Sequence, residues 1–287
     1  MDTGYEHLDK KFELIAPGEI TLLAGPAHVG KTSLAVNLAH QRMLNHEDSI
    51  LFLTLDEDLG ELGKRFIHLD TGIPLFRNGD NRANSGLLDE DSSDEKMTED
   101  NEYTLKINES ARKFQEQIES ENLNVFHQEE LTVAEIQNLC SDHFPDFDFL
   151  IIDYLEAIEF GDNSDKKRSE REKLIVEELK KLARQREIPL LVLSKKEKDE
   201  LEFLQESSDK IAVLGRHGHC DEKRQWDREM KVQLNCIPEP AELEMIYNAT
   251  GSTGSHELLW EAPLLAFRER SEDRDKIISD VFSDLKK

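Results

Sequence analysis

Apolar residues occur along this chain in two kinds of segment that alternate. Short, continuous apolar runs predict strands buried on both faces of a sheet, because such strands have no side that faces water. These runs cover 18–24, 49–55, 123–126, 147–154, 188–194, 211–214, 243–247 and 257–260. Apolar residues spaced three and four positions apart predict amphipathic helices over 33–44, 62–67, 110–121, 132–143 and 166–187. Alternating strands and helices predict an α/β fold with a twisted, mainly parallel sheet and helices on both faces.

Domain organisation follows from where this pattern stops. Residues 77–103 are rich in Asn, Ser and acidic side chains and offer nothing that could anchor a core, so we expect a disordered acidic insertion there. A regulatory or partner-binding role for this tract is the alternative to a plain exposed loop. We expect one domain over residues 1–270, followed by a C-terminal amphipathic helix over 271–287.

Charge and cysteine content narrow the class of protein. The net charge of −26 repels nucleic acid, so any contact with it must be confined to a local basic groove. The 3 cysteines have no paired spacing, which indicates reduced thiols and no disulfide framework. No stretch approaches the roughly 20 apolar residues of a bilayer span, and the first residues do not resemble a signal peptide. We therefore expect a cytoplasmic protein without a membrane partner.

A phosphate-binding loop, or P-loop, is the clearest candidate site. Its pattern G-x-x-x-x-G-K-[ST] lies between a predicted strand and a predicted helix, as the chemistry requires, whereas a chance match would have no such context. The loop reads Gly25-Pro26-Ala27-His28-Val29-Gly30-Lys31-Thr32, and Ser33 follows it. Its glycines let backbone amides face phosphates, Lys31 reaches the β and γ phosphates, and the Thr32 hydroxyl can bind magnesium. The sequence thus predicts ATP and Mg²⁺ as cofactors, with these residues in the binding site.

Carboxylates at the ends of two other predicted strands complete the expected chemistry. Asp153 ends the most apolar run and is the expected second ligand of Mg²⁺. Asp56 and Glu57 follow the second run and are candidates to orient or deprotonate the attacking water, with Lys31 as the third catalytic residue. An acidic surface turn is the alternative interpretation of Asp56 and Glu57.

These motifs, in this order, resemble the C-terminal ATPase domain of the DnaB-type replicative helicases. The resemblance covers most of the chain. It rests on the opening 3–19, the P-loop with 35–39, Leu53-Thr54-Leu55-Asp56-Glu57, 131–135, Ile151-Ile152-Asp153-Tyr154-Leu155-Glu156, 179–194, Gly251-Ser252-Thr253-Gly254 and Phe267. It implies a RecA-like fold of the P-loop NTPase class, ATP-driven work on DNA in replication, and a ring-shaped homo-oligomer. The partners it implies are copies of the chain, single-stranded DNA and another protein.

The chain departs from the family pattern at several site positions. The family's catalytic glutamate falls on Asp56, and the glutamine that senses the γ-phosphate falls on Lys195, which we include among the nucleotide-binding residues. A lysine and an arginine that reach into the neighbouring subunit's site fall on Tyr247 and Ala249. Arg216 matches a family arginine and is expected to contact phosphate or support the site. These departures predict weak hydrolysis.

Three hypotheses follow for function. The first is an ATP-binding, DnaB-like helicase-type ATPase domain acting in DNA replication or a related DNA transaction. The second is a catalytically impaired RecA-like nucleotide-binding module that serves as a regulatory or assembly partner without unwinding DNA. The third is a RecA-like ATPase of recombinase-mediator or clock-protein type. The central lysines that could face DNA, Lys195, Lys196, Lys198 and Lys210, are interleaved with acidic residues and leave little net positive charge.

Overall fold

The computed structural model describes residues 3–73, 94–161, 167–216, 238–261 and 265–269. In that part of the chain, a 9-stranded sheet has the order β11-β10-β9-β8-β1-β7-β5-β2-β3. The strands are β1 (Ile20–Ala24), β2 (Ile50–Thr54), β3 (Leu123–His127), β5 (Phe149–Asp153), β7 (Leu190–Ser194), β8 (Lys210–Arg216), β9 (Glu239–Asn248), β10 (Gly254–Glu261) and β11 (Ala266–Glu269). Strands β8 to β3 in this order are parallel, and β9, β10 and β11 are antiparallel. The expected mainly parallel sheet is confirmed.

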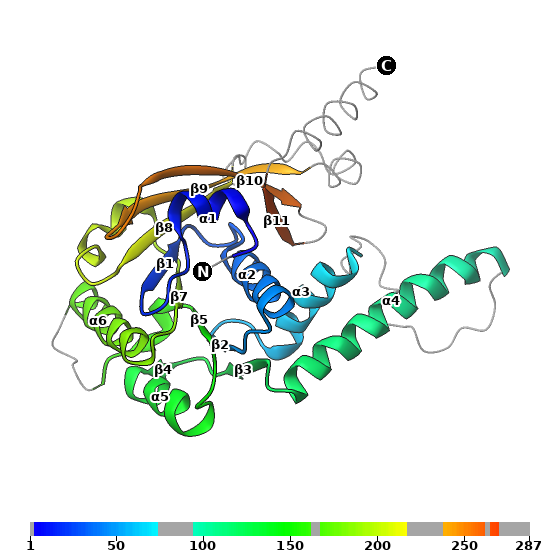
Figure 1. Cartoon of the computed structure of the whole chain (residues 1–287), viewed down its shortest axis with the longest axis horizontal. Helices are drawn as coiled ribbons and strands as arrows, with labels where there is room; N and C mark the ends of the chain where they lie inside the picture. The colour runs from blue at the N-terminus through cyan, green and yellow to red at the C-terminus, as the bar shows by residue number, and fades with distance from the viewer. Residues whose placement is uncertain (1–2, 74–93, 162–166, 217–237, 262–264, 270–287) are drawn as a thin grey trace, which may run out of the picture.

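Helices cover both faces of this sheet, as expected (Figure 1). α1 (Glu6–Phe12), α2 (Lys31–His46) and α3 (Leu59–Thr71) lie on one face, and α5 (Val133–Asn138) and α6 (Arg168–Arg186) lie on the other. None of the helices within the described ranges has the length and apolar content that crossing a membrane requires.

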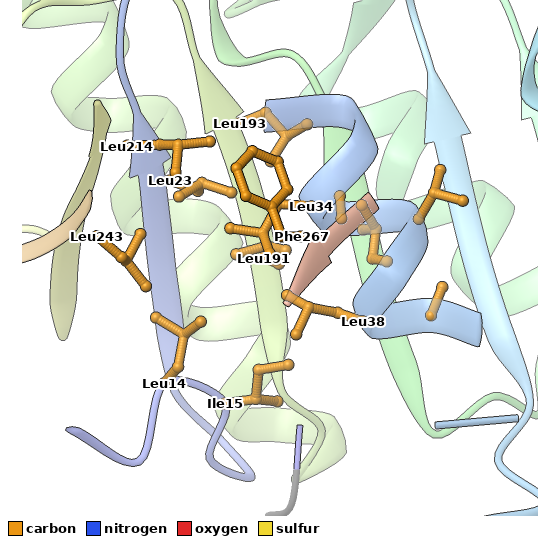
Figure 2. Packing of buried hydrophobic residues seen from close by; sticks show 14 of the residues in the cluster. Leu14, Ile15, Leu23, Leu34, Leu38, Leu191, Leu193, Leu214, Leu243 and Phe267 are labelled. Atoms are coloured by element: carbon orange, nitrogen blue, oxygen red, sulfur yellow. The ribbon is translucent and has the colours of Figure 1, made fainter. Parts of the chain in front are cut away.

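Two hydrophobic clusters, one on each face, hold these layers together. Successive side chains of a strand point to opposite faces, so Phe149 and Ile151 of β5 pack with α2 and α3, while Leu150 and Ile152 pack with α5 and α6. Figure 2 shows the first cluster, in which Leu34 of α2 lies among leucines of β1, β7 and β8. Burial on both faces explains why these strands are continuous apolar runs in the sequence.

One helix is much longer than its sequence pattern indicates. α4 spans Asp94–Glu119, whereas we expected a helix over 110–121. Its C-terminal part is anchored on α3, where Phe114 packs against Gly63 and lies 5.4 Å from Phe66 between ring centroids. Extending an anchored helix costs less than starting one, because the unfavourable nucleation step has already been made.

The start of α4 overlaps the expected insertion. Residues 94–103 belong to α4, and the disorder expected over 77–103 stays a prediction. Residues 77–93 and the predicted C-terminal helix over 271–287 lie outside the described residues. The division of the chain at residue 270 stays a prediction.

The helix expected over 132–143 begins as its sequence predicts. Thr132 and Glu135 form a capping box: the Thr132 hydroxyl accepts from the Glu135 amide at 3.2 Å, and the Glu135 carboxylate accepts from the Thr132 amide at 2.7 Å. The regular helix ends at Asn138, and Leu139–His143 continue as a wider π-helical turn.

Several short elements had no signal in the apolar pattern. These are α1, β11, and the parallel pair formed by β4 (Leu131–Thr132) and β6 (Ile158–Glu159). The longest of them, α1, has 7 residues, which is too few for a periodic pattern to be distinguished from chance. Their positions are set by tertiary contacts.

Asn37 of α2 connects three separate parts of the chain in the core. Its side-chain oxygen accepts from the Phe267 amide at 2.8 Å and from the Tyr5 hydroxyl at 3.2 Å. Its side-chain nitrogen donates to the Ser33 carbonyl at 2.6 Å and to the Leu265 carbonyl at 3.4 Å. The polar atoms of a buried amide are thus all used to attach β11 to the helix that begins at the P-loop.

Replacing Asn37 with alanine should lower the free energy of unfolding by about 2 kcal/mol, because the buried Phe267 amide loses its acceptor. Urea denaturation measures this difference. Asn45→Ala is the matched control on the same helix, since Asn45 is exposed and donates only to Gln41, at 3.1 Å. The control should change stability by less than about 0.5 kcal/mol. Equal effects of the two substitutions would contradict the structural role of Asn37.

Candidate nucleotide-binding site

The P-loop, residues 25–32, connects the carboxyl end of β1 to the first turn of α2 (Figure 1). Since β1 lies between β7 and β8, buried strands support the loop on both sides. Gly25 and Gly30 have φ angles of +146° and +108°, which glycine adopts without strain. A Cβ on Gly30 would lie 2.9 Å from the Phe267 ring, and one on Gly25 would lie 2.6 Å from the Leu214 carbonyl oxygen. Both conformation and packing therefore require glycine.

The side chain of Lys31 is folded back over its own loop. Its Nζ donates to the carbonyl oxygens of Gly25 and Pro26, both at 2.8 Å, and the residue is only 7% exposed. Burial lowers the pKa of Lys31, while the charges of Asp153 and Glu156 oppose this effect. A partly desolvated ammonium group at the start of a helix is well suited to bind an anion.

Thr32 and Asp153 meet across the sheet, as the sequence predicts. The Thr32 hydroxyl donates to Oδ2 of Asp153 at 2.7 Å, and Asp153 is only 4% exposed. Burial raises the pKa of Asp153 to about 6; the Thr32 hydrogen bond opposes this rise, and the charges of Glu57 and Asp56 add to it. A bound cation would favour the charged form of this carboxylate.

The donor atoms at this position fit a magnesium ion. Mg²⁺ prefers oxygen ligands and keeps several water and phosphate oxygens, so Thr32 and Asp153 suffice as the protein's share. Among the residues that the structure describes, His, Cys, Asp and Glu side chains form no cluster of three or more that could hold a metal by themselves. The site therefore suits a metal that arrives with a polyphosphate.

Asp56 and Lys195 form an ion pair across the carboxyl edge of the sheet. The Nζ of Lys195 lies 3.2 Å from Oδ2 of Asp56 and 3.4 Å from the ring centroid of Tyr154. Burial opposes a charged amine here, but hydrogen bonds to Tyr154 and Asp56 raise the pKa of Lys195. Glu156 fixes the backbone at this point by accepting from the Lys195 amide at 3.1 Å and from the Ser194 hydroxyl at 2.5 Å.

Glu57 has a different partner, which the sequence did not indicate. Arg65 of α3 forms a two-point ion pair with the Glu57 carboxylate, with its Nε 2.8 Å from Oε2. The same guanidinium donates to the Ser33 hydroxyl at 2.8 Å. Arg65 lies 8 residues from Glu57, and a turn and a helix start separate them, so no regular spacing pointed to the pair.

Arg216 contacts the P-loop from the opposite side. It donates to the His28 carbonyl at 3.0 Å, and its guanidinium lies 4.9 Å from the ring centroid of Trp260. Trp260 in turn lies 4.6 Å from Phe267, the residue that packs on Gly30. Burial lowers the pKa of Arg216. Arg216 therefore contacts the backbone of the P-loop and the ring of Trp260.

Tyr247 and Ala249 lie away from this site. Tyr247 pairs with Ile211 at the start of β8, and the Ala249 amide donates to the Asp209 carbonyl at 2.9 Å. The start of β8 is at the amino edge of the parallel strands, whereas the P-loop is at the carboxyl edge. These two residues therefore do not contribute to the site of their own chain.

The remaining predicted site residues lie together at the carboxyl edge of the sheet. The P-loop follows β1, Asp56 and Glu57 follow β2, Asp153 ends β5 and Lys195 follows β7. A phosphate-binding loop between a buried parallel strand and a helix defines the class of P-loop NTPase domains. The family model described as DnaB-like helicase C terminal domain matches residues 1–269, and the chain belongs to this family. The resemblance seen in the sequence is confirmed.

Relatives with similar sequences are described as replicative helicases. A probable plasmid replicative DNA helicase of Chlamydia muridarum is 30% identical over 73 residues, which cover 25% of this chain and 16% of the relative. The replicative DNA helicase DnaB of Buchnera aphidicola (subsp. Schizaphis graminum) is 25% identical over 217 residues, which cover 74% of this chain and 41% of the relative. The chain thus matches less than half the length of these relatives. None of these similarities favours the catalytically impaired alternative.

Two solved structures share the fold. One, described as an ATPase domain, superposes with a TM-score of 0.70 at 19% identity, covering 94% of this chain and 91% of that chain. The other, a DnaB-like replicative helicase described with its interactions with primase, gives a TM-score of 0.67 at 19% identity, covering 94% of this chain and 62% of that chain. The expected RecA-like fold is confirmed.

Raising the pH through the folded-state pKa of Asp153 should destabilise the metal-free protein. That pKa, about 6, lies above the ordinary value of 3.8, so between these values the folded protein keeps a proton that the unfolded chain has released. The resulting stabilisation is present at low pH and is lost as the pH rises through about 6. In EDTA, the stability of the native protein relative to Asp153→Asn should fall by about 1 kcal/mol between about pH 5 and about pH 7.5, measured by urea denaturation. Parallel pH profiles would contradict this expectation.

Proposed function

We propose that this chain binds ATP with Mg²⁺ and hydrolyses it, as the ATPase domain of a helicase that acts in DNA replication. The observation that carries the proposal is the meeting of three groups at one sheet edge. The Lys31 ammonium lies inside the P-loop, and the Thr32 hydroxyl is 2.7 Å from the buried Asp153 carboxylate. This arrangement supplies a cation for the phosphates and two hard oxygen ligands for their metal.

Each residue has a distinct part in the proposed reaction. Amides at the start of α2 and the Lys31 ammonium bind the phosphates, and the ammonium exchanges its two loop carbonyls for phosphate oxygens. Thr32 and Asp153 would hold Mg²⁺, which supplies charge neutralisation and orientation of the triphosphate. Of the two candidate carboxylates, we assign Asp56 as the base that accepts a proton from the attacking water. Glu57 is less available, because Arg65 engages both of its oxygens.

The four central lysines give little support for contact with single-stranded DNA. Each of the four is paired with a carboxylate: Lys195 with Asp56, Lys196 with Glu172, Lys198 with Glu244 and Lys210 with Glu19. A lysine that is already neutralised gains less from a DNA phosphate. We propose DNA binding from family membership, and we do not assign it to these four side chains.

Assembly is proposed on the same ground. The family resemblance implies a homo-oligomeric ring, and one solved relative is described with its interactions with primase. For this chain, both self-association and a protein partner are proposals. A native mass measurement with and without ATP and Mg²⁺ tests self-association.

Replacing Lys31 with alanine should abolish nucleotide binding, because it removes the cation inside the loop. We expect ATP affinity to fall by more than about 100-fold in calorimetric titration, the scale of a charged contact left unmade. Lys198→Ala is the matched control, since it also removes a lysine from an ion pair, here with Glu244 of β9. Unaltered ATP affinity in Lys31→Ala, with the fold intact by circular dichroism, would refute the site assignment.

ATP turnover measured with and without single-stranded DNA tests the proposed activity. An ATPase domain of a helicase should hydrolyse ATP and do so several-fold faster when DNA is present, because translocation couples the two. Lys31→Ala serves as the background control. ATP binding without turnover in either condition would instead support the catalytically impaired module.

A further inference from the structure

The Asp56–Lys195 ion pair lies at the same carboxyl edge of the sheet as the P-loop. Asp56 follows β2 and Lys195 follows β7, and β5 lies between these two strands. The pair therefore spans the carboxyl end of β5, where Asp153 and Tyr154 are. β7 is also the direct neighbour of β1, which carries the P-loop. Lys195 therefore follows the strand that lies between β1, which carries the P-loop, and β5, which carries Asp153.

Two ammonium groups, those of Lys31 and Lys195, are close enough for their charges to act on each other. The positive charge of Lys195 acts on Lys31 and lowers its pKa, in addition to the larger effect of burial. Two ammonium groups that oppose each other's charge are both stabilised when an anion lies between them. In the nucleotide-free protein, the negative charge that stabilises the Lys195 ammonium comes from Asp56.

The ion pair is accessible enough to exchange partners. The Asp56 and Lys195 side chains are 52% and 37% exposed, respectively, and pairs of this exposure contribute little to stability. By contrast, Glu57 is held by two guanidinium nitrogens of Arg65, a geometry that is stronger and more rigid. The ring of Tyr154 lies 3.4 Å from the Lys195 ammonium and would still support it after a small displacement.

We propose that Lys195 is a switchable cation that neutralises Asp56 in the nucleotide-free protein and transfers to the γ-phosphate of bound ATP, releasing Asp56 to act on the attacking water. This inference rests on the proposed function and deepens it. ADP lacks the γ-phosphate, so the ion pair persists with ADP. Asp56 is therefore free to act as a base only when a triphosphate is bound.

The hydrolysis step balances with these residues. The water oxygen forms a bond to the γ-phosphorus, and the bond between that phosphorus and the β,γ-bridging oxygen breaks. The bridging oxygen keeps the electron pair and leaves with ADP. The free Asp56 carboxylate accepts the water proton and later passes it to the released phosphate or to solvent. The Lys195 ammonium keeps its proton throughout.

Binding measurements on three variants test the exchange without relying on turnover. The probes are the β,γ-imido analogue of ATP and ADP, each with Mg²⁺, in equilibrium titrations. Asp56→Asn should bind the analogue about two- to fivefold more tightly, because the competing ion pair is gone, and should bind ADP unchanged. Lys195→Met should bind the analogue roughly tenfold more weakly and ADP unchanged. Lys195→Arg keeps the cation and should retain the preference for the analogue.

The double variant Asp56→Asn/Lys195→Met separates the exchange from simple repulsion between Asp56 and phosphate. If the exchange occurs, Asp56→Asn has no effect on analogue affinity once Lys195 is absent, because no ion pair remains to be broken. Tightening of the same size in the Lys195→Met background would overturn the proposal, and so would unchanged or weaker analogue binding by Asp56→Asn alone.

Two controls keep this result distinct from failure of the proposed function. Lys198→Met removes an exposed lysine from its pair with Glu244 and should leave both affinities unchanged. If the unmodified chain binds neither nucleotide, the proposed function fails. If it binds both and the Asp56 and Lys195 variants behave like Lys198→Met, only the exchange is refuted.

Discussion

The packing of α2 against the parallel strands is the constraint on which the rest of this structure depends. Leu34 and Leu38 of α2 are fully buried against the leucines of β1 and β7 (Figure 2). Because β1 and α2 are both held in place by this packing, the two ends of the P-loop are fixed, and so is the path of its backbone. That course requires left-handed glycine conformations and places Lys31 and Thr32 at the first turn of the helix. The β10–β11 hairpin strengthens the constraint, since Phe267 closes on Gly30 and is attached to α2 through Asn37.

This rigid frame holds charged groups that are costly to bury. Asp153 and Lys31 are both almost inaccessible to water, and burial shifts the pKa of each toward the neutral form. A protein selected for stability alone would replace such groups with apolar ones. Their position around one loop is therefore best explained by a ligand that carries charges of both signs, such as a polyphosphate with its metal.

Pairing distinguishes the two acidic residues that follow β2. Adjacent residues Asp56 and Glu57 have the same charge and are equally plausible catalysts in the sequence. Arg65 holds Glu57 and is itself hydrogen-bonded to Ser33 of α2, whereas Asp56 reaches across β5 to an exposed lysine. Glu57 is therefore engaged in supporting the structure of the site, whereas Asp56 can exchange its partner and take part in the proposed reaction.

The sequence by itself determined the alternation of strands and helices, the P-loop and the family, and it predicted Asp153 as a candidate magnesium ligand. These features leave local signals, because burial on both faces gives apolar runs and phosphate binding demands a fixed loop pattern. Only the tertiary structure decided that Lys195 meets Asp56, 139 residues away, that Arg65 engages Glu57, and that Arg216 joins the P-loop to Trp260. It also decided that the C-terminal part of α4 packs on α3 through Phe114 and Phe66. Such pairings depend on which strand ends are neighbours in the sheet, and no local pattern of residues encodes that order.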